Sequence, residues 1–426
     1  MSTDSVRRSR AFRLALAVTL GAILSGTLFP SGGEKPAPML DCLVCGERGV
    51  AAIITNIILF LPLGALLELA GWRLSQLCLA AAALSAAIEL AQLFIPGRDS
   101  SLSDVLSNTC GAAVGWLLLR YLRRVVHEEG RGSAVASLIA AGLAILVTAG
   151  SDLLLRPALP ASVYYGQRTP NLEHLEWYRG QVSDVWVGGI TLPDGRMENS
   201  DTVRRLLLEG APLKVRATAG PEVTALASLV SVYDEAQREI VLLGPDRQDL
   251  VFRYRTQSTA WRLDQPDLRV RGALALVAPG ETLVVTVWRE PTGYCLECNG
   301  ASTCHLGFTA GRGWSIVFYP EHLPGWLMRL LDVGWLVGLW FQVGLCARRR
   351  PALWAVGSLL AGLALAPALT GVLATPVPEW LGGVAGALAG IRTRSLVSRY
   401  VGRGQRESAR ENRAATSAST HRSMRP

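Results

Sequence analysis

Long apolar segments follow one another along most of the chain, and a more polar stretch interrupts them once. Crossing a bilayer core of about 30 Å takes roughly 20 apolar residues in a helix. By this measure we predict eight membrane spans, at residues 12–29, 50–70, 74–95, 104–122, 134–151, 326–346, 352–373 and 377–391. The last span is short and rich in small residues, and a cleaved signal peptide is the alternative interpretation of the first.

The interrupting stretch, residues 155–324, has a different periodicity. Apolar side chains recur at every second position in residues 250–254 and 283–287, and residues 268–276 keep the same period at Leu268, Val270, Leu274 and Leu276. Period two is typical of half-buried strands, and turn signals such as Gly244-Pro245-Asp246 separate them. We therefore predict an all-β sandwich or jelly roll of about 160 residues, inserted into an α-helical polytopic membrane protein.

Composition and charge agree with this division. Half of the residues are hydrophobic, only 18% are charged and the mean hydropathy is +0.29, which excludes a disordered chain. Residues 1–13 hold four arginines and one aspartate, and residues 392–426 hold nine arginines and two glutamates. A basic surplus confined to the tails favours orientation in a membrane over nucleic-acid binding, which needs a basic face on a folded domain.

Arginine placement also predicts the topology, because cytoplasmic loops are enriched in positive charge. The clusters at 7–13, 120–131 and 348–350 and the tail all fall on one side if the spans alternate. We therefore expect a cytoplasmic N-tail (1–11), five spans (12–151), an extracytoplasmic sandwich (155–324), three spans (326–391) and a basic, disordered cytoplasmic tail (392–426).

Polar side chains inside three of the apolar spans gather at one depth. Ser85, Glu89 and Gln92 share one helix face, and Asp104 and Asn108 share another. At 1.5 Å per residue, these groups and Asn56 lie within about 10 Å of the outer end of their helices. Together with Arg98 of the adjoining loop, they form what we call the polar cluster: Asn56, Ser85, Glu89, Gln92, Arg98, Asp104 and Asn108. We expect it to open outward as a binding cup.

A structural interpretation of the polar cluster stays open beside the functional one. Amides and hydroxyls often join membrane helices, and Gly111 and Gly115 allow close packing. Carboxylates are more expensive in hydrocarbon, so Glu89 and Asp104 are better candidates for a functional role. Arg98 either rims the cup, where it would receive a charged group, or forms a local ion pair with Asp99.

The order of these motifs resembles the VanZ-like membrane protein family. The resemblance rests on Asn56-Ile-Ile-Leu-Phe-Leu-Pro-Leu-Gly64, on Ser85-Ala-Ala-Ile-Glu89-Leu-Ala-Gln92 with Gly97-Arg98, and on Asp104-Val-Leu-Ser-Asn108-Thr-Cys-Gly111. It covers a core of 50–122. Ser103 stands where family members carry the first of two aspartates. The resemblance implies an integral protein of the bacterial cytoplasmic (inner) membrane linked to glycopeptide (teicoplanin-type) resistance. The sandwich resembles a concanavalin/laminin-G-like jelly roll, notably around residues 229–276.

Five cysteines fall on the extracytoplasmic side of this topology: Cys42, Cys45, Cys295, Cys298 and Cys304. Disulfides are expected in an oxidising compartment, and one cysteine would then be left over. Two Cys-x-x-Cys pairs also fit the ligand count of a zinc site, and redox activity is a third alternative. We assign no metal, no cofactor and no catalytic residue.

Three functions compete at this point. The first is an envelope protein that binds a surface glycan or a lipid-linked peptidoglycan precursor. One or two aromatic residues of the sandwich would stack on sugar rings, from a set of six: Trp177, Tyr178, Trp186, Tyr254, Trp261 and Trp288. The second is an intramembrane enzyme with Glu89 as acid/base and Asp104 or Asn108 orienting the substrate. The third is a structural scaffold. Membrane lipids are expected partners in each, and nucleic acid in none.

Overall fold

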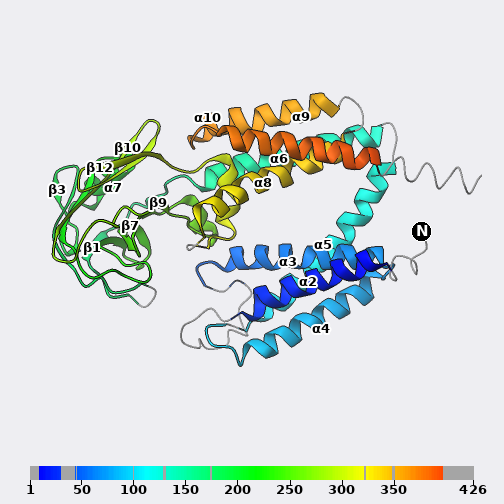
Figure 1. Ribbon diagram of the computed structural model, residues 1–426, viewed down its shortest axis with the longest axis horizontal. Helices are drawn as coiled ribbons and strands as arrows, with labels where there is room; N and C mark the ends of the chain where they lie inside the picture. The colour runs from blue at the N-terminus through cyan, green and yellow to red at the C-terminus, as the bar shows by residue number, and fades with distance from the viewer. Residues whose placement is uncertain are drawn as a thin grey trace, which may run out of the picture.

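A computed structural model describes residues 9–29, 44, 46–98, 100–127, 131–172, 175–320, 323–347 and 351–396. Two groups of helices lie beside each other, and a β-rich domain is attached at one end of them (Figure 1). We call that end of the helices the sandwich end. Apart from the sequence between α6 (Arg131–Leu154) and α8 (Gly325–Cys346), the described residues are mainly helical.

The first group contains α2 to α5, and the second contains α6, α8, the segment α9–η3–α10 and a last helix over 377–396 (Figure 1). The bounds are α2 Arg10–Leu28, α3 Gly49–Leu69, α4 Leu74–Gln92, α5 Leu102–His127, α6 Arg131–Leu154, α8 Gly325–Cys346, α9 Pro351–Leu359, the π-helical η3 Leu360–Leu365 and α10 Ala366–Thr370. Each group has its own apolar core, one centred on Phe60 and Leu77, the other on Leu336 and Trp340.

Seven helical segments among the described residues are long and apolar enough to cross a membrane. They are Arg10–Leu28, Gly49–Leu69, Leu74–Gln92, Leu102–Arg124, Ala134–Leu154, Gly325–Cys346 and Leu353–Thr370. The helix over 377–396 is not one of the seven. A helical membrane region with an inserted β domain is thus the architecture of the chain, while the eighth span stays a prediction.

The β domain contains two antiparallel sheets of six strands, ordered β4-β1-β6-β7-β8-β9 and β12-β11-β10-β5-β2-β3. The strands are β1 Tyr164–Arg168, β2 Gln181–Val187, β3 Ile190–Thr191, β4 Gly195–Arg196, β5 Leu213–Thr218, β6 Val230–Asp234, β7 Glu239–Asp246, β8 Asp249–Tyr254, β9 Leu268–Val270, β10 Thr282–Glu290, β11 Gly293–Cys298 and β12 Ala301–Leu306. Helix α7 (Ser200–Glu209) and the 3₁₀ turns η1 (Gln257–Trp261) and η2 (Ala310–Ile316) complete the domain.

One apolar core joins the two sheets into a sandwich-like body. Val232 of one sheet and Val285 of the other belong to the same buried cluster. A smaller cluster covers the opposite face of β7 and β8, because Leu175 and Leu226 lie over Leu242 and Val251. This second layer explains why β8 is buried on both faces, whereas its period-two pattern predicted burial on one.

The predicted strand over residues 268–276 is wrong beyond Val270. Strand β9 ends there, and Gly272 takes a positive φ of 66° within a turn that continues through Leu276. Leu276 is 96% exposed. The alternation of leucine and alanine after Gly272 therefore does not reflect a pleated strand.

The β domain and the first helix group meet at the start of α3. Ala51 belongs to the core of the sandwich, and the hydroxyl of Thr55 donates to the carbonyl oxygen of Val317 at 3.2 Å. Arg48 forms an ion pair with Asp264, whose carboxylate also accepts from the backbone N–H of Tyr319 at 2.9 Å. Burial raises the pKa of Asp264 although Arg48 opposes the shift. Apolar and charged contacts thus fasten the sandwich to this end of the helices.

Candidate functional site

The polar cluster lies where α3, α4 and α5 meet, and its position depends on the close packing of α3 on α5. A Cβ atom added to Gly64 would overlap the backbone of Ala112, and one added to Gly111 would overlap the backbone of Ile57. A Cβ atom added to Gly115 would likewise overlap the backbone of Leu61. Because these glycines bring the two backbones together, short polar side chains can bridge the helices.

Asn56 and Asp104 form the bridge nearest the sandwich end. The amide Nδ2 of Asn56 donates to Oδ1 of Asp104 at 2.8 Å. Asn56 follows Thr55, which contacts the β domain, so the polar cluster and the sandwich occupy the same end of the helices. The backbone N–H of Asp104 also donates to the hydroxyl of Ser101 at 3.2 Å, which fixes the first turn of α5.

Ser85 and Asn108 form a deeper bridge between α4 and α5. Nδ2 of Asn108 donates to Oγ of Ser85 at 2.9 Å. Ser85 is completely buried and Asn108 is 1% exposed. Oδ1 of Asn108 accepts no hydrogen bond from the described residues. A buried amide oxygen without a donor costs free energy, so this atom has unused capacity to accept one.

Glu89 and Gln92 connect α4 to its neighbours. Oε2 of Glu89 accepts from the backbone N–H of Ser101 at 2.9 Å, and Nε2 of Gln92 donates to the carbonyl of Thr27 in α2 at 2.9 Å. Both side chains are about nine-tenths or more buried. Oε1 of Gln92, like Oδ1 of Asn108, accepts no hydrogen bond from the described part of the chain.

Arg98 takes a position that the sequence did not predict. Its guanidinium donates to the carbonyl of Phe29 at 2.9 Å and to that of Gly26 at 3.0 Å. It therefore satisfies carbonyl groups at the C-terminal end of α2, where a positive charge is favourable. Asp99, its alternative partner, lies outside the described residues.

The members of the polar cluster bond mainly to one another and to backbone groups, and Asn56, Arg98 and Asp104 are only half-buried. Two buried acceptor oxygens, on Gln92 and Asn108, have no donor among the described residues, and the same cluster contains the carboxylates of Glu89 and Asp104. Such a set is chemically suited to receive hydrogen-bond donors, which are hydroxyl, amide N–H or ammonium groups.

The second helix group contains three buried carboxylates that the sequence analysis missed. Asp332 of α8 forms an ion pair with Arg312 at 3.0 Å, and Glu379 accepts from the hydroxyl of Thr309 at 2.5 Å and from the N–H of Gly311 at 2.9 Å. Asp152 of α6 is completely buried, with Glu379 as a charged neighbour. Asp332 and Glu379 lie inside predicted apolar spans, so the reasoning that selected Glu89 would also have found them.

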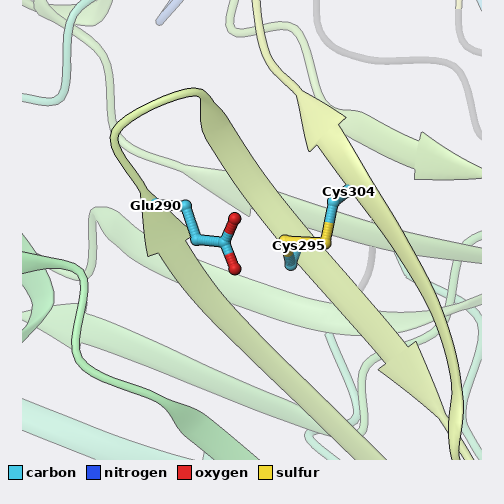
Figure 2. Close-up of side chains that lie close together, drawn as sticks. All are labelled: Glu290, Cys295 and Cys304. Atoms are coloured by element: carbon cyan, nitrogen blue, oxygen red, sulfur yellow. A yellow bond between two sulfur atoms is a disulfide. The ribbon is translucent and has the colours of Figure 1, made fainter.

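Among the described cysteines of the sandwich, Cys295 of β11 and Cys304 of β12 form a disulfide. Cys298 is a free, buried thiol, and burial raises its pKa. Figure 2 shows the carboxylate of Glu290 beside the disulfide, a grouping with the residue types of a metal site. Both sulfurs are used by the S–S bond, so the zinc alternative does not fit these residues. Cys42 and Cys45 lie outside the described residues.

Comparison with known proteins identifies the first helix group only. Residues 7–123 match the model of the VanZ/LLP1 family. This match contains α2 to α4 and most of α5, and with them every member of the polar cluster. No curated protein matches the chain, and no solved structure does. The resemblance of the sandwich to a concanavalin/laminin-G fold therefore remains a prediction.

Proposed function

We propose that this chain is a VanZ-like protein of the bacterial cell envelope that binds a surface glycan or a lipid-linked peptidoglycan precursor. In this proposal it spans the cytoplasmic membrane eight times, keeps both termini in the cytoplasm and contributes to resistance to teicoplanin-type glycopeptides. The family match over residues 7–123 and the seven apolar helices support the membrane and envelope assignment.

The observation that carries the binding function is the pair of unused acceptors in the polar cluster. Oε1 of Gln92 and Oδ1 of Asn108 are buried, and no described residue donates to them. Glycans and peptide precursors are rich in hydroxyl and amide N–H groups, which are the donors that these oxygens lack. The sandwich adds a candidate stacking surface at Trp177, which is 55% exposed.

The test is complementation of a deletion strain. We expect Asn108→Leu and Gln92→Leu to lower teicoplanin resistance to the level of the deletion strain. Each change removes from the protein one acceptor oxygen to which the ligand would donate a hydrogen bond. Cys110→Ser is the matched control on α5, since the Cys110 side chain is exposed outside the polar cluster. Equal resistance in wild type, Asn108→Leu and Gln92→Leu, at equal membrane expression, would overturn the proposal.

The proximity of the Glu89 and Asp104 carboxylates favours one alternative, an intramembrane acid/base enzyme. Glu89→Gln separates the two functions. A glutamine keeps an oxygen for the N–H of Ser101 but transfers no proton, so the binding proposal expects resistance to survive this change. Loss of resistance in a well-expressed Glu89→Gln protein would support the enzyme instead. Unchanged thermal stability of a Glu89→Leu/Asp104→Leu double variant would argue against a purely structural scaffold.

A further inference from the structure

A large open cavity lies between the sandwich and the start of α3. Its volume is about 840 Å³, and strands β6 to β8, the turn at 259–265 and the residues just before α3 line it. We call it the junction cleft. Five arginines and three acids face it: Arg48, Arg238, Arg253, Arg255, Arg262, Glu47, Glu239 and Asp264. The wall of the cleft therefore carries a positive excess within a domain whose sequence is acidic overall.

Arg255 is the arginine of this set that has no ion-pair partner among the described residues, although the negative charges of Asp234 and Glu47 act on it. Arg48 pairs with Asp264, Arg253 with Glu239 at 2.8 Å and Arg238 with Asp234 at 2.7 Å, while Arg262 donates to the carbonyl of Val44 at 2.8 Å. No described residue forms a hydrogen bond or an ion pair with the guanidinium of Arg255, which is half-buried at the end of β8. Burial and the neighbouring charge of Arg238 lower the pKa of Arg255.

Two further hydrogen-bond donors that line the junction cleft have no acceptor among the described residues. Tyr233 is only 4% exposed, and its buried phenol oxygen forms no hydrogen bond with the described residues. Burial raises the pKa of Tyr233 to about 12, so the phenol keeps its proton and can donate it. Nε2 of Gln265 is a third buried donor without an acceptor. The guanidinium, the phenol and the amide N–H are hydrogen-bond donors without acceptors, and an anion would supply acceptor oxygens for all three.

Exposed aromatic side chains beside the junction cleft support its placement near lipid headgroups. Large aromatic side chains are exposed around the same end of the helices: Trp261 by 68%, Phe318 by 53% and Trp326 by 63%. Trp261 comes directly before Arg262, and Phe318 directly before Tyr319, both of which line the cleft. Exposed tryptophans at the ends of membrane helices mark the interface between hydrocarbon and water.

We propose that the junction cleft is a binding site for a phosphate group, with Arg255, Tyr233 and Gln265 as its donors. A guanidinium forms paired, charge-assisted hydrogen bonds with phosphate oxygens, and these are stronger than neutral ones. The phosphate comes either from a lipid headgroup or from a free anion in the adjoining aqueous phase. This site goes beyond the proposed function and does not depend on it, because no residue of the polar cluster lines the cleft.

The test uses the purified full-length protein in a zwitterionic detergent without phosphate groups. Titration with short-chain phosphatidylglycerol, and separately with inorganic phosphate, is followed by calorimetry. We expect saturable binding that Arg255→Gln weakens about tenfold or more, the loss of roughly one charge-assisted hydrogen bond. Tyr233→Phe, which keeps the ring, should weaken binding by a smaller factor. Arg196→Gln is the control, since Arg196 is an exposed arginine of β4 that does not line the cleft.

The two ligands distinguish the sources. Binding of phosphatidylglycerol alone identifies a lipid headgroup, and binding of both identifies the phosphate group itself as the recognised element. Absence of binding by either ligand would overturn the proposal. So would binding that Arg255→Gln and Tyr233→Phe leave unchanged. The resistance of the Asn108→Leu and Gln92→Leu strains tests the polar cluster, and the calorimetric titration tests the junction cleft. Either proposal can therefore fail while the other stands.

Discussion

Gly64→Ala is expected to prevent the first four helices from packing in their native arrangement. The added Cβ would overlap the carbonyl group of Ala112, which is backbone and cannot rotate away as a side chain would. Overpacking of a core costs about 1–3 kcal/mol and occasionally more. Overlap of a Cβ atom with backbone belongs at the upper end of that range, so we expect the free energy of unfolding to fall by about 3 kcal/mol or more.

Gly142→Ala provides the matched control. Gly142 lies in α6, where an added Cβ meets no atom within 4 Å. Alanine is the better helix former by about 1 kcal/mol in soluble helices, so this variant should be as stable as the wild type or more so. Thermal unfolding of both detergent-solubilised proteins, with the yield of monomer by size exclusion, measures the difference. Equal melting temperatures for Gly64→Ala and Gly142→Ala would show that α3 and α5 are not in close contact.

The second large effect is expected from Arg269→Met in the sandwich. The Arg269 guanidinium is 2.6 Å from Oδ2 of Asp246, 3.2 Å from Oδ2 of Asp267 and 3.3 Å from Oδ2 of Asp249. Burial alone would lower the pKa of Arg269, but the surrounding carboxylates, led by Asp267, raise it. Removing the cation takes away the shared arginine of the buried carboxylates Asp246 and Asp267, whereas Asp249 keeps Arg271 at 3.8 Å. Breaking a buried ion pair in this way costs about 3–5 kcal/mol.

The size of this deficit identifies its cause. Thermal unfolding of Arg269→Met and of the wild type, followed by tryptophan fluorescence, measures it. Arg196→Ala is the control, because Arg196 is exposed and lies 3.9 Å from Glu198, and exposed pairs contribute at most about 1 kcal/mol. A deficit no larger than that of the control would refute the role given to Arg269.

The helices could be predicted from sequence because hydrocarbon imposes a strict length and composition. For the same reason, polar groups in apolar segments singled out most of the polar cluster, and spacing alone placed Glu89 and Gln92 on one face of α4. Hydrogen-bond partners could not be predicted in this way. Arg98 caps α2 because the fold brings Gly26 and Phe29 to it, a contact between residues about 70 positions apart.

The sandwich was less predictable because strand partners are distant in sequence. Alternation identified β8 and β10 but continued past β9 into a turn, and it could not show that Leu175 and Leu226 cover the second face of β8. The same limit applies to the junction cleft. Tyr233 lies in β6 and Arg255 directly follows β8 of the same sheet, and only the fold brings them to one cavity beside α3.

The central claim is that the polar cluster and the sandwich face the outside of the cell together. Leu276→Cys tests it most directly, because this residue is 96% exposed on the sandwich and accessible to a membrane-impermeant maleimide. Arg124→Cys, exposed near the far end of α5, is the control for the opposite side. In intact cells we predict labelling of Leu276→Cys above the wild-type background, and labelling of Arg124→Cys only after permeabilisation. The reverse pattern, with Leu276→Cys protected until the cells are opened, would contradict the account.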